Sequence, residues 1–173
     1  MNDMVGRIQD DRNWLQRLGA KIPGFRGYIE KETRRDADKI LRDTITDKFN
    51  VQARRITQLQ MDLVSSAKLE YVDDMERAAT KLKLFVDRVK TTPRGYAGFF
   101  DAVQVKEEQL EQLYQWDLQL VEEAEKYAGA VDATAGAIGS DADIPTAVRA
   151  LIDATAQLNE LYSKREHVLL GSV

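Results

Sequence analysis

Apolar residues recur along most of this 173-residue chain at the spacing of helices that pack side by side. From Ile45 to Leu63, and again from Leu110 to Val131, the stripe positions alternate in steps of three and four residues. This heptad spacing is typical of helices packed lengthwise in coiled-coil fashion. No alternation of single apolar and polar residues persists, so β-strands are not expected. The pattern predicts an all-α, antiparallel helical bundle of four to five helices.

The longest uninterrupted stretch of the pattern predicts a helical hairpin. No glycine or proline lies between Gly27 and Pro93, which is long for one helix of a globular protein. A break is expected at Ser65–Lys68, because two serines disfavour a helix interior and suit helix ends. The predicted helices then cover about 28–65 and 69–89. One continuous helix over 28–91 remains the alternative.

The other predicted elements flank this hairpin. A short amphipathic helix precedes Ala20, a fourth helix covers the stripe from Leu110 to Val131, and a last helix begins near Pro145. Residues 128–143 combine small residues with glycine, which predicts a flexible linker. The chain thus divides into residues 1–143 and a C-terminal helix, residues 144–173, docked on the bundle or on a partner.

Charge is distributed unevenly along the chain. Residues 1–100 hold 20 basic and 15 acidic side chains, residues 101–143 hold 2 and 11, and the net charge of the whole chain is −4. A net negative charge does not favour nucleic-acid binding. The contrast favours contacts between the basic hairpin and the acidic fourth helix, within one chain or between two.

The composition excludes several kinds of chemistry. Without cysteine there are no disulfides, thiolate metal sites or cysteine nucleophiles. The only histidine, His167, has no second imidazole to share a metal with, and no phosphate-binding loop or nucleophile motif occurs. We therefore assign no catalytic residue, no cofactor and no metal site, and predict that the protein is not an enzyme.

Two polar residues interrupt the apolar stripes. Gln52 lies between Phe49 and Ile56, and Asp117 lies between Leu113 and Leu120. A carboxylate on a core stripe needs a partner or a raised pKa. The favoured interpretation is a core ion pair or a contact that sets the helix register, for both residues. The alternative for Asp117 is a group that handles protons.

Aromatic residues gather in two connecting segments and are the best candidates for an interaction surface. One segment follows Pro93 and the other is the turn after Pro23, and the first predicted helix adds a further ring. Between the two interpretations of the connector, the sequence favours a plug at one end of the bundle, with Phe99 and Phe100 buried and Phe25 in the same role, over a site for a partner. The candidates are Trp14, Phe25, Tyr96, Phe99 and Phe100.

Three stretches carry a resemblance to a known group of proteins. They are IPGFRGYIEKETRRDADKILRDT, LEYVDDMERAATKLKLFVDRV and GYAGFFDAVQVKEEQLEQLYQWD, and they span roughly Ile22 to Asp132. In them the chain resembles a group of bacterial all-helical proteins with no known activity. The resemblance implies a helical fold and nothing about mechanism. The hairpin layout is also similar to phage-shock and ESCRT-III-like scaffolds, in architecture alone.

These observations favour a non-enzymatic helical scaffold or adaptor that acts through helix–helix association, with itself or with another helical protein. The first alternative is a peripheral membrane or envelope-stress protein that uses its N-terminal amphipathic helix. The second, less favoured, is a metal-dependent enzyme built on carboxylates. With neither a signal-like N-terminus nor an apolar run long enough to span a bilayer, the expected location is the cytoplasm.

Overall fold

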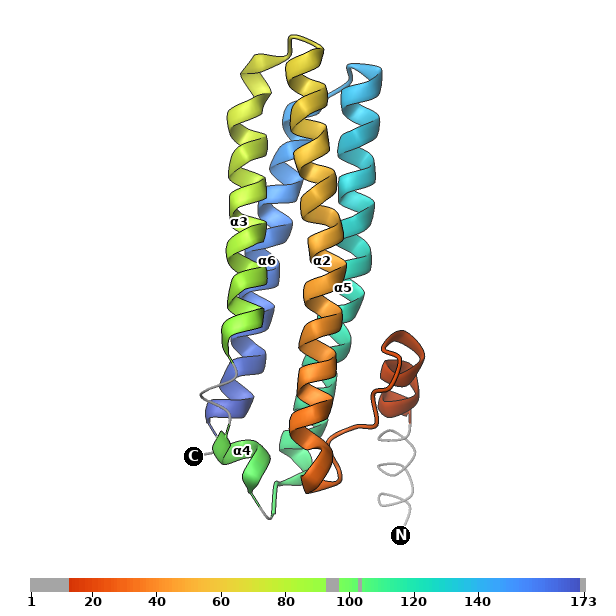
Figure 1. The fold of residues 1–173 in the computed structure, drawn as a ribbon, viewed down its shortest axis with the longest axis vertical. Coiled ribbons are helices and arrows are strands. Elements are labelled where there is room, and N and C mark those ends of the chain that lie inside the picture. Colours follow the sequence, from red (N-terminus) through yellow and green to blue (C-terminus); the bar gives the residue numbers. More distant parts are fainter. Residues whose placement is uncertain (1–12, 93–96, 103, 172–173) are drawn as a thin grey trace.

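The computed structural model describes residues 13–92, 97–102 and 104–171, and within them the chain is built from four long helices (Figure 1). These are α2 (Arg34–Ser65), α3 (Val72–Thr91), α5 (Glu107–Ser140) and α6 (Ile144–Leu170). Short 3-10 turns, η1 (Lys31–Thr33) and η2 (Leu69–Tyr71), precede α2 and α3, and the short helix α4 (Ala97–Asp101) lies between α3 and α5. Residues 13–21 are also helical.

The four long helices form a bundle of two antiparallel hairpins, α2–α3 and α5–α6, which lie side by side. Each long helix packs against two others, because α3 also contacts α6 and α2 also contacts α5. The heptad positions of the sequence supply the core between them. The prediction of an all-α antiparallel bundle is confirmed.

The hairpin break lies where two serines predicted it. Helix α2 ends at Ser65, and the backbone N–H of Lys68 then donates back to the carbonyl of Leu63 over 2.9 Å. Ala67 closes this turn in the left-handed conformation, with φ at 57°. The alternative of one continuous helix over 28–91 is therefore wrong.

We expect Ala67→Gly to raise the free energy of unfolding by about 1 kcal/mol, because glycine adopts a positive φ without the Cβ clash of alanine. Urea denaturation measures the change. Ala133→Gly is the matched control, since Ala133 is exposed within α5. There glycine is expected to cost about 1 kcal/mol. A loss of stability in both variants would contradict the expectation.

The predicted linker at 128–143 is wrong for most of its length. Helix α5 continues to Ser140, and the connection to α6 is only Asp141–Asp143, whose two aspartates both have positive φ. Five alanines in 128–140 favour the helix, because alanine has the highest helix propensity. Burial of Val131, Thr134 and Ile138 at helical spacing holds this part of α5 in the bundle.

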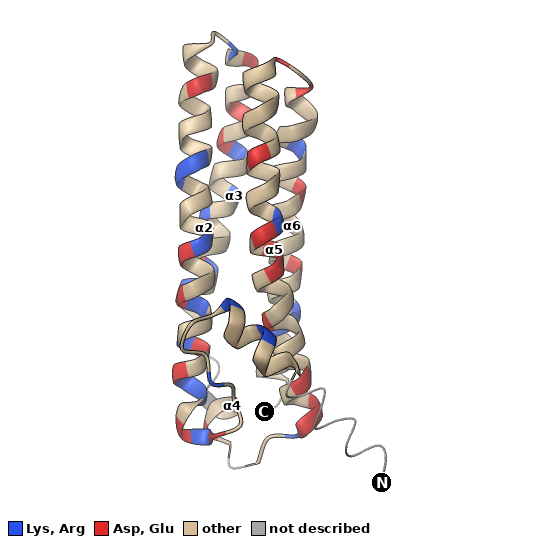
Figure 2. Cartoon of the chain, turned by 90° about the vertical axis from the view of Figure 1, so that its right-hand side faces the viewer, with Lys and Arg blue, Asp and Glu red and all other residues tan. Residues whose placement is uncertain are grey.

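The described part of the N-terminal segment packs on the bundle. Leu18 and Ile22 are fully buried. Arg17 and Lys21 form ion pairs with Glu122 (3.0 Å) and Glu125 (2.9 Å) of α5. In Figure 2, the red positions of acidic residues recur along α5. The acidic helix thus meets basic side chains of its own chain.

The apolar residues that the N-terminal segment would offer to a membrane lie only partly within the described residues. Met4, Val5 and Ile8 lie outside them, whereas Leu18 is in the core. No helix in the described ranges combines the length and the apolar character needed to span a membrane.

Candidate functional site

A cluster of polar side chains is buried at the end of the bundle where α2 begins and α6 ends. We call its five members the buried charge cluster, and they come from four parts of the chain. Tyr28 precedes α2, Asp38 and Arg42 belong to α2, Asp117 to α5 and Arg165 to α6. All five side chains are buried, Tyr28, Asp117 and Arg165 completely. The cluster therefore ties both hairpins and the segment before α2 together.

Arg165 lies at the centre of the cluster and holds two carboxylates. Its Nε donates to Oδ1 of Asp117 and its Nη2 to Oδ1 of Asp38, each over 2.6 Å. The second oxygen of each carboxylate has its own donor. The Tyr28 hydroxyl donates to Oδ2 of Asp117, and Nε of Arg42 donates to Oδ2 of Asp38, each over 2.7 Å. Two cations thus balance two anions, and every carboxylate oxygen is hydrogen-bonded.

Burial dominates the pKa values within the cluster. It raises the pKa of Asp117, because the loss of hydration outweighs the attraction of Arg165 and the hydrogen bond from Tyr28. Burial, and then the negative charge of Asp117, raise the pKa of Tyr28 well above its ordinary value. Burial acts against the charge of Arg165, but Asp117 and Asp38 outweigh it and raise the arginine's pKa. Arg165 therefore stays charged and Tyr28 neutral.

This geometry bears on the two interpretations of Asp117. Both of its oxygens accept hydrogen bonds from protein donors, and the side chain has no exposed surface. Asp117 therefore forms a core ion pair. A buried network that is almost fully satisfied specifies one arrangement of the helices around it. The buried charge cluster therefore serves to hold the helices around it in place.

Sequence reasoning missed Arg165 and Asp38, although the signal was present. The core positions of α6 are spaced by alternating steps of three and four, and Arg165 occupies one of these steps between Tyr162 and Leu169. Asp38 lies three residues before Leu41 on the core face of α2. A charged residue at a heptad core position is therefore the pattern that identifies all three members of the ion-paired centre.

Gln52, the other predicted polar core residue, is separate from the cluster. It is buried on α2, and its side-chain oxygen accepts a hydrogen bond from Nη1 of Arg55 over 3.1 Å. Arg55 also pairs with Asp132 of α5. Gln52 thus contributes to the contact between α2 and α5.

Three of the five predicted aromatic residues plug the end of the bundle where α2 begins. Phe25, Phe99 and Phe100 are buried, and the ring of Tyr28 packs against two of them, with centroids 5.4 Å from Phe25 and 6.0 Å from Phe100. These three phenylalanines therefore offer no exposed contact surface and lie in the plug that the sequence favoured, because aromatic rings gain most from burial. Trp14 is half-buried with the Arg17 guanidinium over its ring, and Tyr96 lies outside the described residues.

Two further residues hold the segment before α2 in place. The buried Arg34 side chain donates to the carbonyl oxygens of Tyr28 (2.6 Å) and Ala102 (2.8 Å). The backbone N–H of Tyr28 donates to the hydroxyl of Tyr114 over 2.6 Å. Gly27 makes this approach possible, since its φ is 86° and a Cβ there would lie 2.6 Å from that hydroxyl.

Gly27→Ala is expected to lower the free energy of unfolding by about 2–3 kcal/mol, because it combines a strained backbone with a clash against Tyr114. Gly24→Ala is the matched control. Its φ is also positive, at 85°, but a Cβ there would meet no atom within 4 Å. It should cost only the backbone strain, about 1 kcal/mol. Chemical denaturation of both variants separates the two contributions, and equal losses would contradict the predicted clash.

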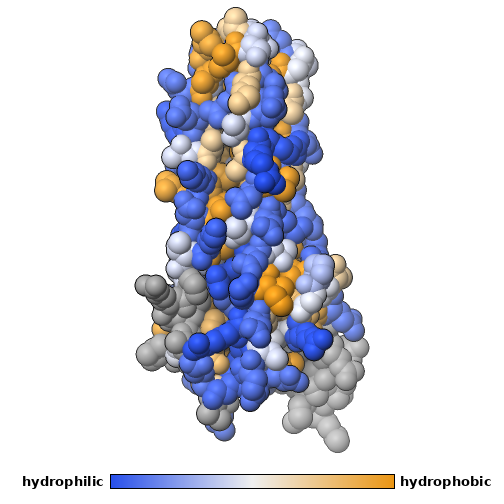
Figure 3. Space-filling view, viewed as in Figure 1, coloured by the Kyte–Doolittle hydropathy of each residue, from blue (hydrophilic) through white to orange (hydrophobic). Residues whose placement is uncertain are grey.

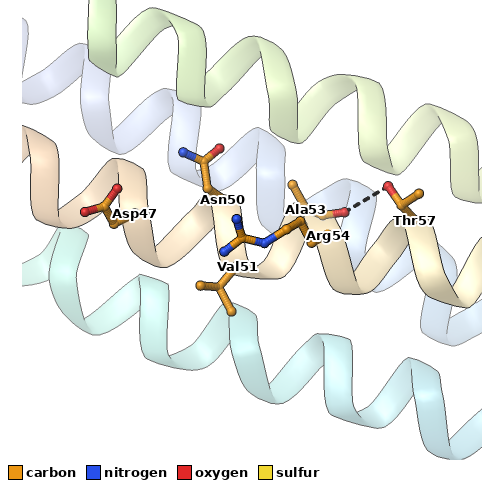
Figure 4. Close-up of a pocket in the computed structure, with 6 residues that line it drawn as sticks. All are labelled: Asp47, Asn50, Val51, Ala53, Arg54 and Thr57. Carbon is orange, nitrogen blue, oxygen red and sulfur yellow. Dashed lines mark hydrogen bonds between the residues drawn. The ribbon is translucent and has the colours of Figure 1, made fainter.

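The outer face of the α2–α3 hairpin offers the second candidate site. A shallow groove of about 430 Å³ runs between the two helices, and we call it the hairpin groove. Small side chains lie along it, among them Ala53, Thr57, Ala79 and Thr80. Figure 4 shows a neighbouring hollow on α2, where Asn50 and Thr57 point towards α3 and Val51 points towards α5.

No family model, curated protein or solved structure matches this chain. Within the described ranges, no three His, Asp or Glu side chains lie close enough together to hold a metal ion. The site must therefore be interpreted from its own geometry.

Proposed function

We propose that this protein is a non-enzymatic helical scaffold that works by helix–helix association through the outer face of its α2–α3 hairpin. The observation that carries the proposal is where apolar side chains remain exposed. Of the seven large apolar side chains exposed in the described residues, five lie on this hairpin and the turn between its helices, although one of the five, Val51, points towards α5 (Figure 4). They are Val51, Met61, Val64, Leu69 and Leu84.

Three of these exposed apolar residues lie at the tip of the hairpin, beyond the hairpin groove. Met61 and Val64 are 57% and 54% exposed near the end of α2, and Leu69 is 62% exposed in the turn. Figure 3 shows hydrophobic side chains gathered at that end of the molecule. An apolar surface next to a groove of small residues is the kind of surface on which another helix packs.

Acidic residues of α5 already form ion pairs with basic residues of the same chain. Arg17 and Lys21 cover acidic residues of α5, and Arg55 pairs with Asp132. At these positions, the basic and acidic segments therefore pair with each other within one chain. This supports the hairpin face, in preference to α5, as the surface that binds a helical partner.

Sedimentation equilibrium across the micromolar range at low salt tests the proposal. We expect the protein to associate with itself, and a Met61→Gln/Leu84→Gln variant to lose this association while keeping its helical circular dichroism. Ile29→Gln/Leu170→Gln is the matched control, because it replaces two apolar residues that are also exposed, at 64% and 48%, but lie away from the hairpin. A wild-type protein that stays monomeric, or equal losses in both variants, would refute the proposal.

A further inference from the structure

Helix α3 carries a pattern of exposed charge that is complementary to itself. Glu76 and Lys83 are both exposed and both line the hairpin groove. They lie seven residues apart, which is two turns or about 10.5 Å along one face of the helix. Neither forms an ion pair with another described residue. The midpoint between them falls between Ala79 and Thr80, two small residues.

We infer that the partner of the hairpin face is a second copy of this chain, with α3 lying antiparallel to α3 of that copy across a two-fold axis near Ala79 and Thr80. This inference rests on the proposed function and deepens it. In such a two-fold arrangement, residues at equal distances from the axis face each other. Glu76 of each copy then lies opposite Lys83 of the other, so the pairing forms two ion pairs.

The small residues at the midpoint fit this arrangement. Ala79 on α3 and Ala53 and Thr57 on α2 leave room for a second helix to approach closely. Leu84, which follows Lys83 in α3, is 63% exposed. Like charges would face each other if the two α3 helices were parallel and in register, which selects the antiparallel orientation.

The size of the face predicts the strength of the contact. Helix α3 has 20 residues. The face is therefore about 30 Å long and about 20 Å wide, on the order of 600 Å² per copy. That area lies at the low end for specific interfaces and fits a weak, reversible dimer. Exposed ion pairs in such a contact are also screened by salt.

Charge reversal tests the arrangement. Glu76→Lys places lysine opposite Lys83, and Lys83→Glu places glutamate opposite Glu76. Each variant alone is expected to dimerise on the order of tenfold more weakly than the wild type. Mixing the two variants restores opposite charges at both pairs, so a heterodimer should form at wild-type strength. The double variant Glu76→Lys/Lys83→Glu should also dimerise with itself.

Lys81→Glu is the matched control for charge, because Lys81 is exposed on the same helix but does not line the groove. It should dimerise like the wild type. A second readout uses the absence of cysteine from the chain. In Thr80→Cys the only thiol lies beside the proposed axis, so mild oxidation should link two copies. Thr146→Cys, exposed near the start of α6, should stay unlinked.

The outcomes separate this inference from the proposed function. Sedimentation equilibrium and circular dichroism are measured for every variant. If the wild type dimerises but both single variants match it, or their mixture fails to restore the dimer, the antiparallel α3 pairing is overturned while self-association stands. A wild-type protein that remains monomeric across the micromolar range overturns both.

Discussion

Replacing Arg165 with methionine is expected to lower the free energy of unfolding by about 3–5 kcal/mol. The side chain is completely buried and holds Asp117 and Asp38 at 2.6 Å each. Its removal leaves two carboxylates in a low-dielectric core with a single cation, Arg42, beside them. Urea denaturation followed by circular dichroism measures the loss.

A second variant distinguishes a lost charge partner from a lost packing residue. In Tyr28→Phe/Asp117→Leu/Arg165→Met, the uncompensated charge and its hydrogen-bond donor are removed together, while Asp38 keeps Arg42. Replacing a buried ion pair with apolar residues is often neutral or stabilising. We therefore expect the triple variant to recover most of the stability lost in Arg165→Met. A triple variant as unstable as the single one would contradict this account.

Arg35→Met is the matched control for the loss of an arginine ion pair. Arg35 pairs with Asp101 at 2.5 Å, but both side chains are more than half exposed. Exposed pairs contribute about 0–1 kcal/mol. The difference between the Arg165 and Arg35 variants therefore measures the effect of burial on an ion pair of similar length.

Raising the pH above 10 is expected to unfold the protein steeply. Burial raises the pKa of both Tyr28 and Tyr127 in the folded state. Below the pKa of an unfolded tyrosine, about 10, both residues are neutral in either state and stability is unaffected. Above it, the unfolded chain releases protons that the folded protein retains. Stability then falls towards about 1.4 kcal/mol per pH unit for each residue, until the folded pKa is reached.

Ultraviolet absorbance of tyrosinate, recorded together with circular dichroism, measures this coupling. Part of the tyrosinate signal should appear only as helicity is lost. Tyr28→Phe and Tyr127→Phe should each reduce that late signal, because each deletes a hydroxyl whose pKa is raised by burial. If all tyrosinate signal appeared while the helices were intact, the hydroxyls would not be shielded as the structure describes.

The spacing of apolar residues predicted most helices correctly. The prediction failed where tertiary contacts override local composition. Glycines at 129, 136 and 139 favoured a linker, but each faces open space, and the residues between them pack into the core. Helix α2 was expected to begin near Tyr28 and begins at Arg34. The reason is that Tyr28 is held in the buried charge cluster and its carbonyl is bound by Arg34.

At the candidate sites too, the sequence pattern identified some residues, and tertiary packing decided the role of others. Asp117 and Gln52 were identifiable as polar core residues because a heptad stripe places them among apolar neighbours. The plug formed by Phe99 and Phe100 was favoured but not determined by the sequence, since an aromatic connector is compatible with burial or with exposure. Likewise, exposure of Leu84 and Met61 depends on which faces of α2 and α3 the other helices cover.

By itself the sequence determined the all-helical class, the hairpin break and the core stripes, because helix periodicity and chain breaks are properties of neighbouring residues. Only the tertiary structure decided what the polar core residues do. Arg165 meets Asp117 across 48 positions and Asp38 across 127. No local pattern encodes such a pairing. It exists because packing brings three helices together at one end of the bundle and removes their charges from water.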